Sequence, residues 1–384
     1  MSVTIAKGFR AAGVKAGLKS SGNHDLALVV NDGPLQLAAA VFTTNRCQAN
    51  PILWSKEVIK DAAVQAIVLN SGGANCYTGP QGFQTTHATA ERVADGLGLN
   101  AGDVLVCSTG LIGEQLDRDK LTAGVDAAIA ELSNDGGEVA SLAIMTTDSV
   151  PKRAEFTSPQ GWSIGGMAKG AGMLAPGLAT MLVVITTDAV LDAAESDSAL
   201  RAATRVTFDR LDSDGCMSTN DQVTLMVSGA SEIAPTQDDF KAALIYVCHS
   251  LAQQLLTDAE GSSHDIAIEV INAATEDDAV KVGRSVARNN LFKAAIYGND
   301  PNWGRILAAV GVTDAAFDPY NIDVSINGVS VSRHGQPDQS RDLVDLKPRE
   351  VHIVISLNAG HQSATIYTND LTHEYVEENS AYSS

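Results

Sequence analysis

One threonine stands where its hydroxyl can attack the chain itself. Thr180 follows the bend signal Pro176-Gly177 and precedes the apolar run of residues 181–185, so we expect it at the mouth of a buried strand. There it can undergo an N→O acyl shift: its hydroxyl attacks the carbonyl of Ala179, an ester forms, and water cleaves the ester. The new chain would begin with Thr180, whose free α-amine, with an ordinary pKa of about 7.7–8.0, can act as base for its own hydroxyl. A β-branched residue at a strand start is ordinarily structural, so position alone leaves both roles open.

Two further segments carry residues suited to chemistry. Residues 165–173 read GGMAKGAGM, which matches neither the phosphate-binding GxxxxGK[ST] pattern nor the dinucleotide-binding GxGxxG pattern. Glycine content alone predicts a close-packed turn there, and a lone lysine such as Lys169 is typical of a surface charge. Ser108-Thr109-Gly110 follows a strand-like run, where a hydroxyl and an N–H can point at one place as in an oxyanion hole. A simple turn at the strand end is the alternative.

The sequence contains no pattern for a metal or a bound cofactor. Asp212, Asp214 and Gly215 lack the spacing of a calcium loop, the eight histidines form no HExxH, and the five cysteines form no CxxC. We therefore predict no metal, nucleotide or flavin. The odd number and wide spacing of the cysteines favour a reducing cytoplasm.

The elements that would position these residues alternate between strands and helices. Apolar, β-branched runs predict strands at residues 66–69, 104–107, 180–187, 223–227, 266–271 and 351–357. A helix is expected from Asp238, with an apolar stripe of Phe240, Leu244, Val247, Leu251 and Leu255. Further helices are expected from Ser198 to Phe208, and from Asp277 or Asp278 through Gly283 towards Leu291. This alternation predicts a layered α/β or α+β fold, with the last strands (323–326, 351–357 and 363–367) pairing antiparallel.

Composition limits the class of protein. The 384 residues suffice for two domains or one large core, and 45% of them are hydrophobic. With 26 Lys and Arg against 46 Asp and Glu, the net charge of −20 argues against binding to nucleic acids or to anionic membranes. The apolar run 178–185 is far shorter than the ~20 residues that span a bilayer, and residues 1–19 lack the apolar block of a signal peptide. We expect a cytoplasmic protein.

Several motifs occur in a recognisable order along the chain. They are NSGGAN (70–75), CSTGLIG (107–113), IMTTD (144–148), KGAGMLAPGLATML (169–182), STND (218–221), DAEG (258–261), DPNWGR (300–305) and ENSAYSS (378–384). With them the sequence closely resembles, nearly end to end, the ornithine acetyltransferase (glutamate N-acetyltransferase) family of arginine biosynthesis. The segment 169–182 resembles the self-cleaving segment of that family.

The resemblance implies a fold and a set of site residues. The fold would be a layered α-β-β-α sandwich like that of self-processing aminopeptidases. Cleavage between Ala179 and Thr180 would give an α chain (1–179) and a β chain (180–384) that share one core, with two copies of each forming a heterotetramer. Thr180 would be the nucleophile, and Thr109 and Gly110 the oxyanion hole. The implied substrate-binding residues are Thr146, Lys169, Thr180, Glu260, Asn379 and Ser384, the last two in a tail that would ordinarily be frayed.

The implied activity is a ping-pong transfer of acetyl from N2-acetyl-L-ornithine to L-glutamate through acetyl-Thr180. Both substrates are α-amino acids, so one pocket can hold the shared α-carboxylate, with Lys169 as its charge partner. Acetyl-CoA as a further donor would make the enzyme bifunctional, which these residues do not decide. Two alternatives remain: a self-processed amidase or aminopeptidase that uses Thr180 for hydrolysis, and an unprocessed small-molecule-binding protein.

Two positions depart from the commoner family pattern. Gly73 stands where many relatives have Asn, in a loop expected near the oxyanion hole. Ser262-Ser263-His264 replaces a segment that often ends in Thr-Lys, and it closely follows Glu260. The second departure bears on substrate preference rather than on the reaction.

Overall fold

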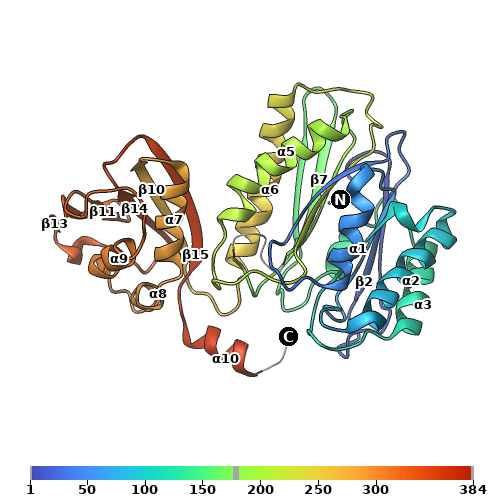
Figure 1. Ribbon diagram of the computed structural model, residues 1–384, viewed down its shortest axis with the longest axis horizontal. Helices are drawn as coiled ribbons and strands as arrows, with labels where there is room; N and C mark the ends of the chain where they lie inside the picture. The colour runs from blue at the N-terminus through green and yellow to red at the C-terminus, as the bar shows by residue number, and fades with distance from the viewer. Residues whose placement is uncertain (1, 176–180, 382–384) are drawn as a thin grey trace.

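The larger part of the molecule is built around two β-sheets (Figure 1). The first has the order β1 (Phe9–Val14), β2 (Leu26–Asn31), β4 (Ala66–Asn70), β5 (Val104–Ser108). The second has the order β3 (Leu37–Phe42), β9 (Gln222–Val227), β8 (Leu182–Thr187), β7 (Ser163–Lys169), β6 (Lys152–Thr157). The structure, a computed structural model, describes residues 2–175 and 181–381, so Ala179, Thr180 and Ser384 lie outside the described residues.

The sheets pack face to face and helices cover both outer faces. Val29 and Leu69 of the first sheet share a buried cluster with Met167, Val184 and Met226 of the second. The helices on the first sheet are α2 (Gly79–Leu97) and α3 (Arg118–Ala130), and those on the second are α5 (Ala193–Val206) and α6 (Gln237–Thr257). Two more helices, α1 (Asn50–Val58) and α4 (Gly137–Ala143), pack on β5 and β1. The predicted α-β-β-α sandwich is confirmed.

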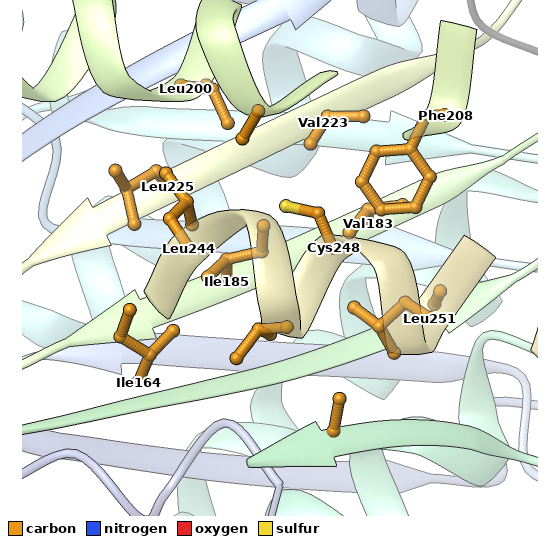
Figure 2. Packing of buried hydrophobic residues seen from close by; sticks show 14 of the residues in the cluster. Ile164, Val183, Ile185, Leu200, Phe208, Val223, Leu225, Leu244, Cys248 and Leu251 are labelled. Carbon is orange, nitrogen blue, oxygen red and sulfur yellow. The ribbon is translucent and has the colours of Figure 1, made fainter. Parts of the chain in front are cut away.

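Helix α6 fixes the strand that follows residue 180. Its predicted stripe is fully buried, with Phe240, Leu244, Val247, Leu251 and Leu255 at most 1% exposed. Figure 2 shows Leu244, Cys248 and Leu251 of this helix lying against side chains of β8 and β9. Burial of one such side chain contributes ~1.5–3 kcal/mol. The helix begins earlier than predicted, because its N-cap is Thr236 rather than Asp238. The Thr236 hydroxyl accepts the N–H of Asp239.

Two predictions about the second sheet and its helices are correct only in part. The helix expected from Ser198 begins at Ala193, because Asp192 and Glu195 form a reciprocal capping box there. The glycine-rich segment is a turn only in its second part: residues 165–169 belong to the buried strand β7, and a bend follows at residues 171–173. A Cβ on Gly165 would lie 2.1 Å from the Ser2 carbonyl oxygen, and one on Gly166 would lie 2.9 Å from Leu251 Cδ1. Glycine is therefore needed for close packing within a strand.

A second α+β unit follows the sandwich. Its sheet has the order β13 (Gln336–Pro337), β12 (Val329–Arg333), β11 (Asp323–Ile326), β14 (Glu350–Ser356), β10 (Asp265–Ala273), β15 (Gln362–Asn369). Three helices share its separate core: α7 (Glu276–Ala287), α8 (Asn290–Tyr297) and α9 (Trp303–Val310). β11 pairs antiparallel with β14 as predicted, whereas β15 pairs with β10 and not with β14. Gly283 lies inside α7, where a Cβ would be 2.6 Å from Ile366 Cγ1, so glycine allows the helix to pack closely on β15.

The last helix returns to the sandwich. α10 (His373–Ala381) leaves β15 and runs from the second unit back towards the sandwich (Figure 1). Short 3-10 turns complete the secondary structure at Ile59–Asp61, Ala101–Asp103, Phe208–Arg210 and Arg341–Leu343. None of the helices in the described ranges combines the length and apolar character that a bilayer crossing needs.

Candidate active site

One pocket collects predicted site residues from distant parts of the chain. Those that line it are Thr109, Gly110, Thr146, Lys169, Glu260 and Asn379. They come from the ends of β5, α4, β7 and α6 and from α10. The remaining predicted residues, Ala179, Thr180 and Ser384, lie outside the described residues. Within residues 2–175 and 181–381, no group of three or more His, Cys, Asp or Glu side chains is placed to hold a metal ion.

The turn after β5 leaves two hydrogen-bond donors free. The N–H of Thr109 donates to the Asn70 carbonyl at 3.0 Å, so only the Thr109 hydroxyl remains available. That hydroxyl accepts a hydrogen bond from Lys169 Nζ at 3.3 Å and keeps its own proton to donate. The N–H of Gly110 has no acceptor among the described residues. A hydroxyl and an N–H on adjacent residues can stabilise one developing oxyanion.

Close packing and one buried amide hold this turn in place. Gly110 has φ +129°, and a Cβ on it would lie 2.9 Å from both the N and Cα of Gly73. Gly73, the departure noted in the sequence, therefore lies directly against the proposed oxyanion hole. The Asn220 side-chain amide donates to the carbonyls of Ser108 (2.8 Å) and Ala74 (2.6 Å) and ties the two loops together. Sequence reasoning included Asn220 only as part of the STND motif and assigned it no role.

Lys169 is a buried lysine whose hydrogen-bond partner among the described residues is the neutral Thr109 hydroxyl. It ends β7, is 1% exposed, and forms no ion pair with any carboxylate in the described part of the chain. Burial lowers the pKa of Lys169, and the charge of nearby Asp148 opposes that shift. Of the two interpretations of Lys169, the structure contradicts a surface charge, and it places the residue in the pocket with the other residues named by the family resemblance. A buried ammonium with one neutral hydrogen-bond partner is suited to binding a carboxylate.

Asp148 connects the elements around Lys169. It accepts the N–H of Thr146 at 2.9 Å and that of Gly170 at 2.7 Å, and it pairs with the buried Lys152. Lys152 also pairs with Asp258 at the end of α6. Burial alone raises the pKa of Asp148, but the Lys169 and Lys152 cations and the Gly170 N–H outweigh it and hold the pKa at about 2. The ionised carboxylate fixes two pocket segments together.

Glu260 lies against the segment that precedes the predicted cleavage point. Its N–H donates to the Ala171 carbonyl at 3.0 Å, and Thr147 donates its hydroxyl to Glu260 Oε1 at 2.7 Å. A Cβ on Gly172 would lie 2.7 Å from Glu260 Oε2, so a side chain there would displace the Glu260 carboxylate. Thr147 was not predicted, although it is adjacent to the predicted Thr146.

The C-terminal helix is anchored to the rest of the molecule at Tyr375. A Cβ on Gly261 would lie 2.2 Å from the backbone nitrogen of Tyr375, which shows how closely α10 docks. Tyr375 donates its hydroxyl to Asp214 Oδ1 at 2.8 Å, and this anchor brings Asn379 of the same helix to the pocket. Ser263 and His264, the other departure, do not line the pocket: both bind Asp370.

Comparisons with known proteins agree with the sequence resemblance. Residues 10–384 match the ArgJ family. The chain is 64% identical over 384 residues to the arginine biosynthesis bifunctional protein ArgJ of Streptomyces avermitilis and also 64% identical over 384 residues to that of Streptomyces coelicolor, with 100% of both chains covered in each case. A solved ornithine acetyltransferase from Mycobacterium tuberculosis, complexed with ornithine, is 52% identical, with a TM-score of 0.45, over 47% of this chain and 96% of that chain.

The match over nearly the whole chain defines the protein as an acyltransferase of arginine biosynthesis. The chain belongs to the ArgJ family.

Proposed function

We propose that this enzyme carries the acetyl group on Thr180 as it passes from N2-acetyl-L-ornithine to L-glutamate. Acetyl transfer between ornithine and glutamate is the activity of the family to which the chain belongs. One observation carries the proposal for the site: the described residues expected to serve Thr180 line one pocket, although they come from distant segments. Met181, which is peptide-bonded to residue 180, is buried and donates its N–H to Asp221, the residue that follows the pocket residue Asn220.

The first half-reaction forms an ester. The Thr180 hydroxyl attacks the acetyl carbonyl of acetylornithine while the Thr180 α-amine takes its proton. The hydroxyl of Thr109 and the N–H of Gly110 stabilise the oxyanion. The C–N bond then breaks, the proton passes to the leaving amine, and ornithine departs. In the second half-reaction, the glutamate amine attacks the ester, and the same groups return the threonine hydroxyl.

The charges in the pocket suit a zwitterionic amino acid. Lys169 supplies a buried cation for the α-carboxylate, and Glu260 supplies an anion for a substrate ammonium. We assign Thr146 and Asn379, which line the same pocket, and Ser384, outside the described residues, to substrate binding. The relatives named bifunctional support acetyl-CoA as a second acetyl donor.

Maturation would precede transfer. Self-cleavage between Ala179 and Thr180 frees the α-amine and leaves chains of residues 1–179 and 180–384. β7 and β8, one on each side of the cut, pair along the whole length of β8, which supports an intact core after cleavage. Two copies of each chain would make up the enzyme.

Intact mass spectrometry tests this proposal. The wild type should give two fragments that meet between Ala179 and Thr180, and the Thr180→Ala variant one uncut chain. Cleavage of both proteins at that bond would refute the role of Thr180. Incubation of the wild type with acetylornithine alone should leave an acetyl group on the Thr180 fragment, and later addition of glutamate should release it as N-acetylglutamate. Release as acetate instead would identify an amidase.

A further inference from the structure

Two acidic side chains hold the chain on either side of residues 176–180. Before this segment, Asp214 accepts the N–H of Leu174 at 2.7 Å. After it, Asp221 Oδ1 accepts the N–H of Met181 at 3.1 Å. Leu174, Met181 and Asp221 are all 0% exposed, so water does not compete for the contact between Met181 and Asp221, whereas Asp214 is half-buried.

The hold on the first side is shared among several groups. The backbone N–H groups of Ser213 and Asp214 both donate to the Leu174 carbonyl, at 2.6 and 2.9 Å. The Asp214 carboxyl also accepts the Tyr375 hydroxyl at 2.8 Å and so links the same segment to α10. Leu174 is therefore fixed at both of its backbone polar groups.

The hold on the second side depends on one carboxyl group with an unusual environment. Asp221 Oδ2 is buried and has no hydrogen-bond partner in residues 2–175 and 181–381. Burial raises the pKa of Asp221 well above its ordinary value, and the Met181 N–H, Lys169 and the nearby Ser218 N–H and Thr43 hydroxyl oppose that shift. A fully buried acid with an oxygen that no described residue reaches at hydrogen-bond distance is costly to retain for structure alone, and such groups in native proteins call for a functional explanation.

After cleavage, Asp214 and Asp221 would hold residues of different product chains. The peptide bond between residue 180 and Met181 persists after cleavage, so Asp221 continues to act on the backbone of the residue that carries the acetyl group. Leu174 belongs to the other product, and cleavage after Ala179 removes its covalent link to Thr180. Before cleavage, both contacts restrain the ends of the same short segment.

We propose that both carboxyl groups are positioning residues of different scope: Asp214 serves self-cleavage only, whereas Asp221 serves self-cleavage and acetyl transfer. This inference rests on the proposed cleavage between Ala179 and Thr180. Misplacement of reacting groups by about 1 Å costs up to about a hundredfold in rate, so the loss of either contact should be measurable.

The test compares cleavage with transfer in matched variants of the full chain. Asp221→Leu has a similar shape but no acceptor, and Asp221→Asn keeps an acceptor at the Oδ1 position. Asp214→Ala removes the contacts to Leu174 and Tyr375, whereas Tyr375→Phe removes only the second. Intact mass spectrometry follows cleavage with time, and kcat and KM for acetylornithine are expressed per cleaved chain.

We expect Asp221→Leu to lower both the cleavage rate and kcat by about tenfold or more, with KM changed less than about threefold. Asp221→Asn should restore both rates to within about threefold of the wild type, because the Met181 contact is retained. Asp214→Ala should slow cleavage about tenfold or more, yet its kcat per cleaved chain should equal that of Tyr375→Phe.

Several outcomes would overturn the inference. The role of Asp221 would be refuted if Asp221→Leu kept the wild-type kcat per cleaved chain or changed KM alone. It would also be refuted if Asp221→Asn failed to restore the rates. If circular dichroism shows Asp221→Leu to be unfolded, Asp221→Ala, which also lacks an acceptor, takes its place in both assays. A lower kcat in Asp214→Ala than in Tyr375→Phe, or unimpaired cleavage, would remove the role of Asp214. Thr180→Ala is run in parallel as a control for the proposed function. Cleavage of that variant would refute the proposed function itself, whereas the outcomes above would refute only the roles of Asp214 and Asp221.

Discussion

Replacing Gly110 with alanine should displace one proposed oxyanion donor without touching the nucleophile. Gly110 has φ +129°, a conformation that L side chains rarely adopt, and the new Cβ would lie 2.9 Å from both the N and Cα of Gly73. Both opposing atoms belong to the backbone and cannot swing aside like the end of a flexible side chain. The turn must therefore move, and the N–H of Gly110 moves with it.

The size of the effect follows from the donor that remains. Removal of one oxyanion-hole donor costs about 10²–10³ in kcat, or roughly 2.7–4 kcal/mol. Thr109 stays anchored through its N–H to Asn70 and through its hydroxyl to Lys169, so the second donor is retained. We therefore expect a loss of about 10² in kcat, with KM for acetylornithine changed less than about threefold because the contact forms in the transition state.

Gly113 provides the matched control in the same loop. It also has a positive φ, +89°, but no described atom lies within 4 Å of a Cβ placed there. Gly113→Ala should thus cost ~1 kcal/mol of backbone strain and leave the donors in place. Steady-state kinetics per cleaved chain, with thermal unfolding of both variants, makes the comparison. A folded Gly110→Ala enzyme with kcat within about fivefold of the wild type, or an equal loss in Gly113→Ala, would refute the oxyanion assignment.

Two further predictions concern the buried charges. Lys169→Met should raise KM for both acetylornithine and glutamate by about tenfold or more, since each substrate loses the partner of its carboxylate; unchanged KM values in steady-state assays would contradict this. The pKa of Asp148, about 2 in the folded protein against an ordinary 3.8, gives stability of about 2 kcal/mol that is complete above about pH 5 and is lost progressively as the pH falls towards about 1. Asp148→Asn should therefore be less stable than the wild type at pH 7, but its free energy of unfolding, measured in urea, should fall less than that of the wild type between pH 4 and 2. An equal fall in both proteins would show that Asp148 is not the source of this pH dependence.

Local patterns predicted those elements whose own side chains meet the core. The stripe from Phe240 to Leu255 has helical spacing, and each of its members is buried in α6. β7 could not be found in this way, because its glycines carry no apolar signal. Their necessity arises from Ser2 and Leu251, which approach from distant parts of the chain. A tertiary contact decided the conformation, and local sequence does not report it.

The second unit was also hidden from sequence reasoning. The antiparallel pairing of β11 with β14 was predicted, but β10 inserts between β14 and β15. The sequence shows no linker between the two units, since β10 begins soon after α6 ends. In addition, His264, just before β10, and Asp370, just after β15, form a hydrogen bond where the chain enters and leaves the second unit.

For the site, motif order predicted residues that line the pocket but not those that support them. Asn220 became informative only when its amide was found between the carbonyls of Ser108 and Ala74. Likewise, Asp148 stood in a motif beside Thr146, yet its contacts with Gly170 and Lys152 depend on how β6 and β7 pair. Supporting residues act through contacts between segments, so a list of motifs does not reveal their roles.

The pairing of β7 with β8 reconciles a cut chain with an intact site. The strands are antiparallel neighbours from Ile164 opposite Thr187 to Lys169 opposite Leu182, so a cut at residue 180 breaks their connection but none of these pairs. Their side chains also share one core, where Figure 2 shows Ile164 beside residues of the later strands. At ~1.5–3 kcal/mol for each large buried side chain, this shared core outweighs the roughly 4–15 kcal/mol gained in translational and rotational freedom when two pieces separate. Lys169 thus remains opposite Leu182, near the start of the proposed second chain, and the proposed cleavage would leave the described pocket assembled.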